Sequence, residues 1–231
     1  AMHFGIRMNI RWLGHAAFCV TIGGARFLID PWLNNPVYTS KPEDYADVDY
    51  IVVTHDHGDH LGNSIEVLRV APRAKLISVY ETAAYVGEKV GMDRAIGANI
   101  GGPIRLSNGL SVVLTPAQHS STRGTPTGVV IRSKEEALYH AGDTGVFYDM
   151  KLIGELYKPK VALLPIGGHF TMGPEEAALA VDLIRPKYVI PMHYGTFPVL
   201  WGTPQEFIVE TKKRGLAVEI VVLKPGEEVS L

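Results

Sequence analysis

Short apolar runs recur along the chain, and each one ends at a polar residue that can bind a metal or polarise water. The runs hold four to six apolar residues without strict alternation, which is typical of strands buried on both faces. They lead in turn to Asp30, to the histidine-rich stretch 55–60, and to His119, Asp143, His169 and His193. We therefore expect these polar residues to meet at one rim of the sheets.

Helical patterns alternate with these runs. Residues 173–186 carry Pro174 and two glutamates where the first turn of a helix would lie. Residues 201–215 contain threonine and glutamate in the spacing of a capping box and end at a glycine, and residues 81–91 form a third pattern. The glycine-rich segment 97–109 is typical of a turn region between strands. We predict α/β layering and a single domain over residues 1–231.

Composition narrows the function classes. The chain has 231 residues, 46% of them hydrophobic, so it can bury a full core. Its 22 basic and 24 acidic residues leave a formal charge of -2. No block of like charges predicts a binding surface for nucleic acid or anionic lipid. The sequence shows neither a membrane-spanning run nor the apolar core of a signal peptide. The single cysteine, Cys19, excludes a disulfide framework, and we expect a cytoplasmic protein without nucleic-acid or membrane partners.

The most specific motif is "HDHGDH", in which His55, His57, Asp59 and His60 have the spacing HxHxDH. Side chains two apart on an extended segment share a side, so the first two histidines can hold one cation. Gly58 would then let the backbone turn and present the aspartate and the last histidine to a second cation. Imidazole and carboxylate ligands together suit zinc, iron, manganese or nickel.

These segments resemble the metallo-β-lactamase superfamily. The resemblance covers nearly the whole chain: an N-terminal "WLGHAAF" strand, the "THDHGDH" turn, the lone histidine of "PAQHS", the "AGDTG" turn and the histidine of "PMHYG". Within the superfamily the chain looks most like the UPF0173-type metal-dependent hydrolases. Those resemble ascorbate-6-phosphate lactonase and, more distantly, N-acylphosphatidylethanolamine phospholipase D.

The resemblance implies a four-layer α-β-β-α sandwich, with two sheets flanked by helices and built from two similar halves. It also implies two divalent metal ions, zinc in the first place, with manganese, nickel or iron as alternatives. The implied ligands are His55, His57 and His119 for the first metal, Asp59, His60 and His193 for the second, and Asp143 as a bridge between them. A hydroxide held by both ions would attack a small ester, lactone or phosphodiester, and Asp59 would orient it and take its proton.

Two further histidines, His15 and His169, end apolar runs at the same expected rim. We expect both to be catalytic, His15 as a substrate-facing acid or phosphate contact, and the alternative for each is a structural histidine. Asp30 either ends a strand or accepts a hydrogen bond from a ligand imidazole. His140 should point away from the site. Cys19 should be buried, and Tyr194, Phe197 and Trp201 either wall the pocket or belong to the core.

Other functions stay open at this point. An iron-dependent redox enzyme could use the same ligands, and so could a phosphodiesterase or ribonuclease, although no basic patch is visible in the sequence. A scaffold that has lost catalysis is a further alternative, against which the intact Asp59 argues. We expect a small-molecule substrate and, by analogy with the relatives, a homo-oligomer. His3, near the start of the chain, should be disordered.

Overall fold

Two seven-stranded sheets lie face to face in the computed structural model, which describes residues 7–231. The prediction for His3 falls outside that range. The first sheet has the order β16 (Glu228–Ser230), β1 (Asn9–Trp12), β2 (Phe18–Ile22), β3 (Ala25–Ile29), β6 (Tyr50–Val52), β7 (Lys75–Val79) and β8 (Ala95–Ala98). The second has the order β15 (Glu219–Ile220), β14 (Tyr188–Met192), β13 (Val161–Pro165), β12 (Ala137–His140), β11 (Thr127–Arg132), β10 (Ser111–Pro116) and β9 (Ile104–Arg105).

The two sheets share one pattern of strand directions. In each, three antiparallel pairs are followed by three parallel pairs, from β16 to β8 in the first sheet and from β9 to β15 in the second. The C-terminal strand β16 returns to the first sheet and pairs with β1. A separate hairpin is formed by β4 (Asn34–Asn35) and β5 (Tyr38–Thr39).

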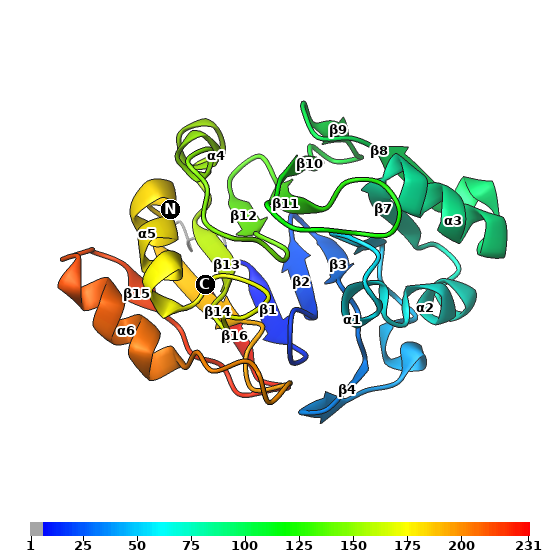
Figure 1. Ribbon diagram of the computed structural model, residues 1–231. Helices are drawn as coiled ribbons and strands as arrows, with labels where there is room; N and C mark the ends of the chain where they lie inside the picture. Colours follow the sequence, from blue (N-terminus) through cyan, green and yellow to red (C-terminus); the bar gives the residue numbers. More distant parts are fainter. Residues whose placement is uncertain (1–6) are drawn as a thin grey trace.

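Helices cover the outer face of each sheet, which gives the expected four layers (Figure 1). The first sheet is covered by α1 (Gly58–Leu61), α2 (Ser64–Val70) and α3 (Tyr80–Val90), with the 3-10 turns η1 (Pro42–Tyr45) and η2 (Met92–Arg94). The second is covered by α4 (Met150–Tyr157), α5 (Pro174–Ile184) and α6 (Pro204–Lys213). All three helical patterns are therefore confirmed. Thr203 caps α6 by accepting a hydrogen bond from the backbone N–H of Glu206.

The apolar runs are buried on both faces because each sheet lies between two other layers. Consecutive residues illustrate this: Val52 packs between the sheets, whereas Ile51 packs under α2 and α3. In the second sheet, Leu163 faces the other sheet and Leu164 faces α4, α5 and α6. Burial of every side chain in such a strand explains why the runs do not alternate with polar residues.

One predicted strand is wrong. The segment "WLGHAAF" is the connection between two strands, because β1 ends at Trp12 and β2 begins at Phe18. The backbone reverses there through hydrogen bonds from Leu13 N to Ala17 O and from Ala17 N to Gly14 O. The apolar residues of this turn are buried, so in sequence it has the same pattern as a strand.

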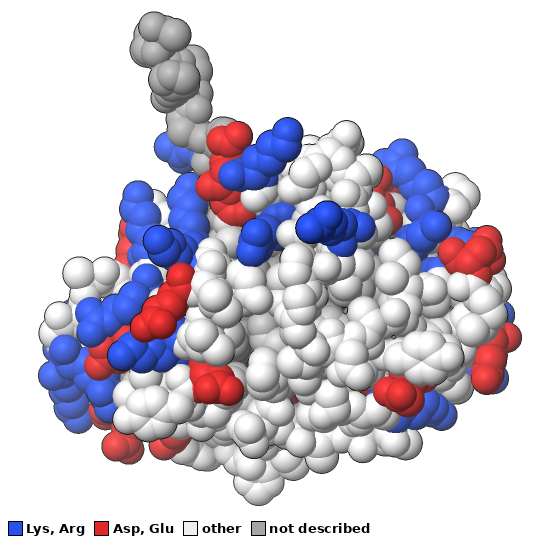
Figure 2. Space-filling view, turned by 90° about the horizontal axis from the view of Figure 1, so that it is seen from above, with Lys and Arg blue, Asp and Glu red and all other residues white. Residues whose placement is uncertain are grey.

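On the face shown in Figure 2, basic side chains are interrupted by acidic ones, so no continuous basic strip crosses it. Within residues 7–231 no helix is long and apolar enough to cross a membrane.

Candidate metal centre

The four residues of the HxHxDH motif lie where β6 ends. His55 and His57 follow the strand, and Asp59 and His60 stand in the single turn of α1. Gly58 is the first residue of this helix; its φ is not positive, and a Cβ atom there would have no neighbour within 4 Å. The backbone turns at Gly58 as expected, but neither its conformation nor its surroundings require a glycine. The start of a helix, which many residues could form, separates the two pairs of side chains.

The first ligand group consists of His55, His57 and His119, which come from the ends of β6 and β10. One ring nitrogen of each lies within 4.8 Å of the others. Burial, followed by the neighbouring imidazoles, lowers the pKa of His55 to about 2, and burial also lowers the pKa of His119. Both rings are therefore neutral at physiological pH, which is the form of histidine that binds metals.

Asp143 lies between this group and a second one. Its Oδ2 atom is 2.9 Å from His60 Nε2, 3.1 Å from His193 Nε2, 3.5 Å from His119 Nε2 and 3.8 Å from His55 Nε2. The turn after β12 makes this position accessible because Gly142 has a φ of 65°, and a Cβ there would lie 2.5 Å from Thr127 O. One carboxylate thus contacts imidazoles of both groups.

The second group contains Asp59, His60 and His193, together with His15. Their ligand atoms again lie within 4.8 Å of one another. Asp59 Oδ2 is 3.5 Å from His60 Nε2 and 3.8 Å from His193 Nε2. The structure therefore brings together all seven residues that were expected as ligands, from the ends of four strands and from α1.

Four atoms of these residues have no hydrogen-bond partner within the described part of the chain. They are His60 Nε2, both ring nitrogens of His193 and Asp143 Oδ1, all buried. Leaving a buried polar atom unpaired costs about 1–3 kcal/mol, so such atoms usually have a partner that a protein chain alone does not provide. Imidazole nitrogens and carboxylate oxygens that converge in this way suit divalent transition metals. The residues present therefore fit metal ions.

The electrostatics also favour cations at the centre. Burial by itself would lower the pKa of His60, but the charges of Asp143 and Asp30 outweigh it and raise this pKa well above its usual value. Burial would raise the pKa of Asp143, yet His193 and His60 hold it well below its usual value. Asp143 thus stays ionised and creates a negative potential where the imidazoles meet.

Asp30 has the supporting role that its position after β3 suggested. Its Oδ2 accepts a hydrogen bond of 2.7 Å from His60 Nδ1. Thr54 holds the same carboxylate through its backbone N–H at 2.8 Å and its hydroxyl at 2.7 Å. Because an ionised aspartate only accepts, one proton of His60 stays on Nδ1, and loss of the second proton on metal binding would leave the lone pair of Nε2 for the centre.

The structure corrects the expectation that His15 faces the substrate. His15 is 0% exposed and lies behind Asp59. Its Nε2 is 2.8 Å from Asp59 Oδ2 and its Nδ1 is 2.6 Å from Thr196 Oγ1. Both ring nitrogens are therefore engaged, and burial lowers the pKa of His15 to about 4, so that the neutral ring has one proton to donate to the carboxylate.

Asp56, within the motif but not a ligand, holds the loop that carries His119. Its carboxylate is almost fully buried and accepts hydrogen bonds of 2.9 Å from the backbone N–H groups of Thr122 and Arg123. The guanidinium of Arg123 adds a bond of 3.1 Å and stacks over the ring of Tyr85 at 3.8 Å. Asp56 therefore ties the two histidine-bearing loops together. Sequence reasoning missed it, although its place between two ligands was a signal.

Two further hydrogen bonds hold the other side of the loop that carries His119. The hydroxyl of Thr144, next to Asp143, accepts a hydrogen bond of 2.9 Å from Gln118 N, and Gly145 N donates to Gln118 O at 3.2 Å. His119 is thus held from both flanks.

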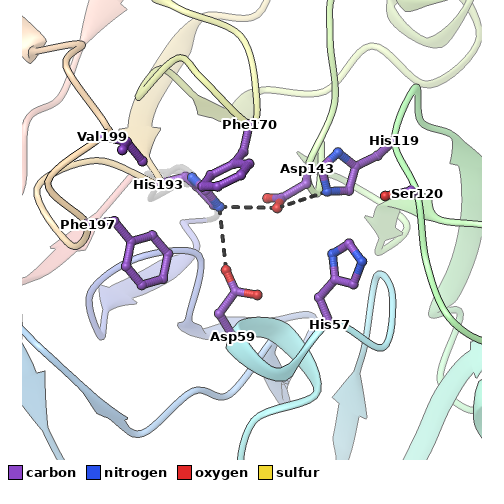
Figure 3. Close-up of a pocket in the computed structure, with 9 residues that line it drawn as sticks. All are labelled: His57, Asp59, His119, Ser120, Asp143, Phe170, His193, Phe197 and Val199. Carbon is purple, nitrogen blue, oxygen red and sulfur yellow. Dashed lines mark ion pairs between the residues drawn. The ribbon is translucent and has the colours of Figure 1, made fainter.

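A cavity of about 630 Å³ opens over the centre. It is lined by His57, Asp59, His119, Ser120, Asp143, Phe170, His193, Phe197 and Val199 (Figure 3). The candidate ligand side chains point into it from several loops, and apolar side chains stand beside His193. Asp59 is the more accessible carboxylate, with 23% of its side chain exposed against 4% for Asp143.

The remaining expected residues lie around this cavity or away from it. His169 is exposed, packs edge-on against Phe170 and is not among the lining residues. Phe197 lines the cavity, whereas Trp201 packs against Gly168 and Tyr194 packs on the ring of Trp12. As predicted, His140 and Cys19 are buried outside the ligand set, and His140 hydrogen-bonds to Ala16 O at 2.9 Å.

The backbone is strained around the centre. Seven non-glycine residues have positive φ in the described chain, and four of them are at or beside the site: His15, Asp30, His169 and His193. A non-glycine residue in this region is uncommon and costs on the order of 1–3 kcal/mol, so the surrounding contacts must hold these residues there.

The chain is similar to known proteins over most of its length. The sequence profile described as "Beta-lactamase superfamily domain" matches residues 25–194. The chain is 58% identical to a "UPF0173 metal-dependent hydrolase" of Hyperthermus butylicus, over 94% of this chain and 97% of that protein. It is 57% identical to a protein of the same description from Thermofilum pendens, with 96% and 98% covered. Among solved structures, Igni18, a metallo hydrolase from Ignicoccus hospitalis, superposes with a TM-score of 0.91 at 45% identity and covers 97% of this chain and 98% of its own.

Proposed function

The chain belongs to the beta-lactamase superfamily and, within it, to the UPF0173 metal-dependent hydrolases. We propose that it uses two divalent metal ions to hydrolyse a small ester, lactone or phosphodiester. The observation that carries this proposal is the position of Asp143. Its Oδ2 lies 2.9 Å from His60 and 3.5 Å from His119, so one carboxylate faces two separate ligand groups. Such an arrangement suits two cations that share a ligand.

The proposed ligands follow the two groups. His55, His57 and His119 would hold one ion, and Asp59, His60 and His193 the other, with Asp143 between them. The donor set favours zinc first and allows manganese, nickel or iron. Ions bound there would supply Lewis acidity and lower the pKa of water, which is the chemistry that hydrolysis at neutral pH requires.

The protein's own groups would position the reactants. Asp59 is the carboxylate most exposed to the cavity and can accept a hydrogen bond from the attacking water, which orients the water toward the substrate. His15 donates to Asp59 and cannot reach the substrate, so we assign it a positioning role. Thr196 in turn fixes the His15 ring.

His169 would act as a proton donor to the leaving group from the rim of the cavity, a role that rests on its place beside Phe170. Asparagine tolerates the positive φ of this position, which makes His169→Asn the suitable test. Parental turnover in that variant would remove His169 from the mechanism.

The proposal is tested by elemental analysis of the purified protein together with a panel of ester, lactone, thioester and phosphodiester substrates, each assayed with zinc, manganese, nickel and iron. We expect up to two bound ions per chain and metal-dependent hydrolysis of at least one class. A protein that binds one independent ion, or one that hydrolyses none of these classes in any metal form, would refute the proposal. Turnover that requires iron and dioxygen would favour the redox alternative.

A further inference from the structure

Three apolar side chains stand together beside the metal centre. Phe170, Phe197 and Val199, called here the apolar wall, line the cavity on the side of His193 (Figure 3). Phe170 is 52% exposed and Val199 is 44% exposed. Apolar surface gains about 25 cal/mol per Å² when it is removed from water, so a clustered, water-exposed wall inside a cavity favours an apolar ligand.

The wall is built on two loops of the second half of the chain. Phe170 follows β13, and Phe197 and Val199 follow β14. The ring of Phe197 is fixed by Trp32, at 5.7 Å between ring centroids, and by His15 at 5.2 Å. The ring of Phe197 thus contacts His15, which in turn positions Asp59. A substrate group that packs on Phe197 would therefore lie at a defined distance from the centre.

Apart from the metal ions proposed at the centre, the cavity offers no cationic lysine or arginine side chain to a substrate anion. None of its nine lining residues is a lysine or an arginine, whereas two are carboxylates. Arg123, in the loop that carries His119, is already paired with Asp56 and stacked on Tyr85. The cavity therefore lacks the cationic side chains that usually bind a phosphate group.

We propose that the apolar wall binds the hydrocarbon part of a neutral carboxylic ester or lactone, and that such substrates are preferred to phosphodiesters. This inference rests on the proposed hydrolysis and narrows its substrate class. Water forms a new bond to the carbonyl carbon, the bond from that carbon to the alkoxy oxygen breaks, and the alkoxy group leaves with a proton. An acid and an alcohol result, and no oxidant or reductant is needed.

The first experiment varies only the acyl chain. The methyl esters of acetic, butyric and pentanoic acid keep the alcohol constant, and monomethyl succinate has nearly the length of methyl pentanoate but ends in a carboxylate. We expect kcat/KM to rise about threefold to fourfold for each added methylene, the scale of burying one such group. Monomethyl succinate and bis(p-nitrophenyl) phosphate should both be poorer substrates than methyl pentanoate by at least tenfold.

Variants locate the effect on the wall. Phe170→Ala is the mildest change, because within residues 7–231 the ring of Phe170 has a single ring contact, edge-on with His169. It should flatten the dependence on chain length by raising KM for methyl pentanoate, with unchanged metal content. Leu152→Ala, on the exposed surface of α4 and outside the cavity, is the matched control and should keep the parental dependence.

Binding gives a readout that does not need turnover. Pentanamide, a slowly hydrolysed amide with the acyl chain of methyl pentanoate, should bind at least tenfold more tightly than acetamide in calorimetry, and Phe170→Ala should reduce this ratio. Equal binding of the two amides, ester hydrolysis without a chain-length trend, or faster hydrolysis of the phosphodiester would each overturn the inference. If all hydrolysis is absent, the proposed function fails, and the amide ratio still decides whether the wall is an apolar subsite.

Discussion

Asp30 accepts a hydrogen bond of 2.7 Å from His60, and neither side chain is exposed to solvent. This contact decides which nitrogen of His60 carries the proton. Because the carboxylate also accepts two hydrogen bonds from Thr54, it cannot rotate away from the imidazole. Asp30 thereby keeps His60 Nε2 turned toward the centre, where Asp143 Oδ2 lies 2.9 Å away.

Asp30→Asn tests this relationship with almost no change of shape. An amide NH2 facing His60 Nδ1 would donate to it and force the proton onto Nε2, where it blocks a metal. We expect metal affinity to fall by about 10- to 100-fold, the usual effect of losing a partner of a ligand histidine. Titration against a competing chelator measures it. Asp149→Asn, on the surface at the start of α4, is the control. Equal affinities in the two variants would contradict the tautomer argument.

Asp143 is expected to couple the two ions. Ions bound only by the folded state stabilise it, by about 2.7 kcal/mol when the free metal concentration is one hundred times Kd. A chelator should therefore lower the melting temperature of the parent protein. Asp143→Ala should abolish cooperativity between the ions in calorimetric titration. A melting curve that does not respond to the chelator would count against the site, and cooperative binding retained in the variant would exclude a bridging role.

His15 should act through Asp59 and not through the substrate. His15→Asn keeps a residue type that tolerates the φ of 55°, but its shorter side chain cannot span Thr196 and Asp59. We expect kcat to fall by roughly 100-fold or less, with KM and metal content close to parental values, because Asp59 loses its orienting donor. Metal analysis and steady-state kinetics on the same samples check this. A variant that loses metal and activity together would instead mark His15 as a ligand.

Substitutions of Asp56 and Arg123 compare what each side chain contributes to the free energy of unfolding. Asp56→Ala leaves two backbone N–H groups of the His119 loop without their acceptor and should cost about 1–3 kcal/mol in the free energy of unfolding. Arg123→Ala removes a partly exposed ion pair and the stacking over Tyr85, each worth no more than about 1 kcal/mol, and should cost less than Asp56→Ala. Denaturant unfolding at fixed metal concentration compares them. Similar losses in both would show that the guanidinium, and not the backbone contacts, holds the loop.

His140 should make the fold sensitive to acid. Burial, as the largest cause, lowers its pKa below the usual 6.5, so the unfolded chain takes up a proton there before the folded chain does. The stability that this residue contributes is therefore complete above pH 6.5 and is lost as the pH falls below it. In His140→Gln, the decline of unfolding free energy toward low pH should be shallower by up to about 1.4 kcal/mol per pH unit. Unfolding curves at several pH values and equal metal loading measure the slope, and parallel slopes would disprove the assignment.

Much of the candidate site could be read from the chain because its signals are local. The HxHxDH spacing places four candidate ligands close together after a strand, and the lone histidines and Asp143 follow apolar runs whose burial is evident in their composition. The role of Asp30 could also be predicted, because an imidazole that binds a metal usually donates its other N–H to an acceptor. The helices at 80–90, 174–184 and 204–213 followed from caps and periodicity, which act over a few residues.

Other features depended on contacts between distant segments. A buried turn and a buried strand have the same hydrophobic pattern, so only the pairing of β1 with β2 showed that His15 lies in a turn behind Asp59. The bonds from Asp56 to residues more than sixty positions away, and the meeting of Phe170 with Phe197, likewise come from the packing of the two sheets. The sequence by itself determined which side chains can bind metal, because that is a property of their chemistry. The tertiary structure decided which of them face the cavity and which support it, because that depends on the direction in which each buried backbone segment holds its side chain.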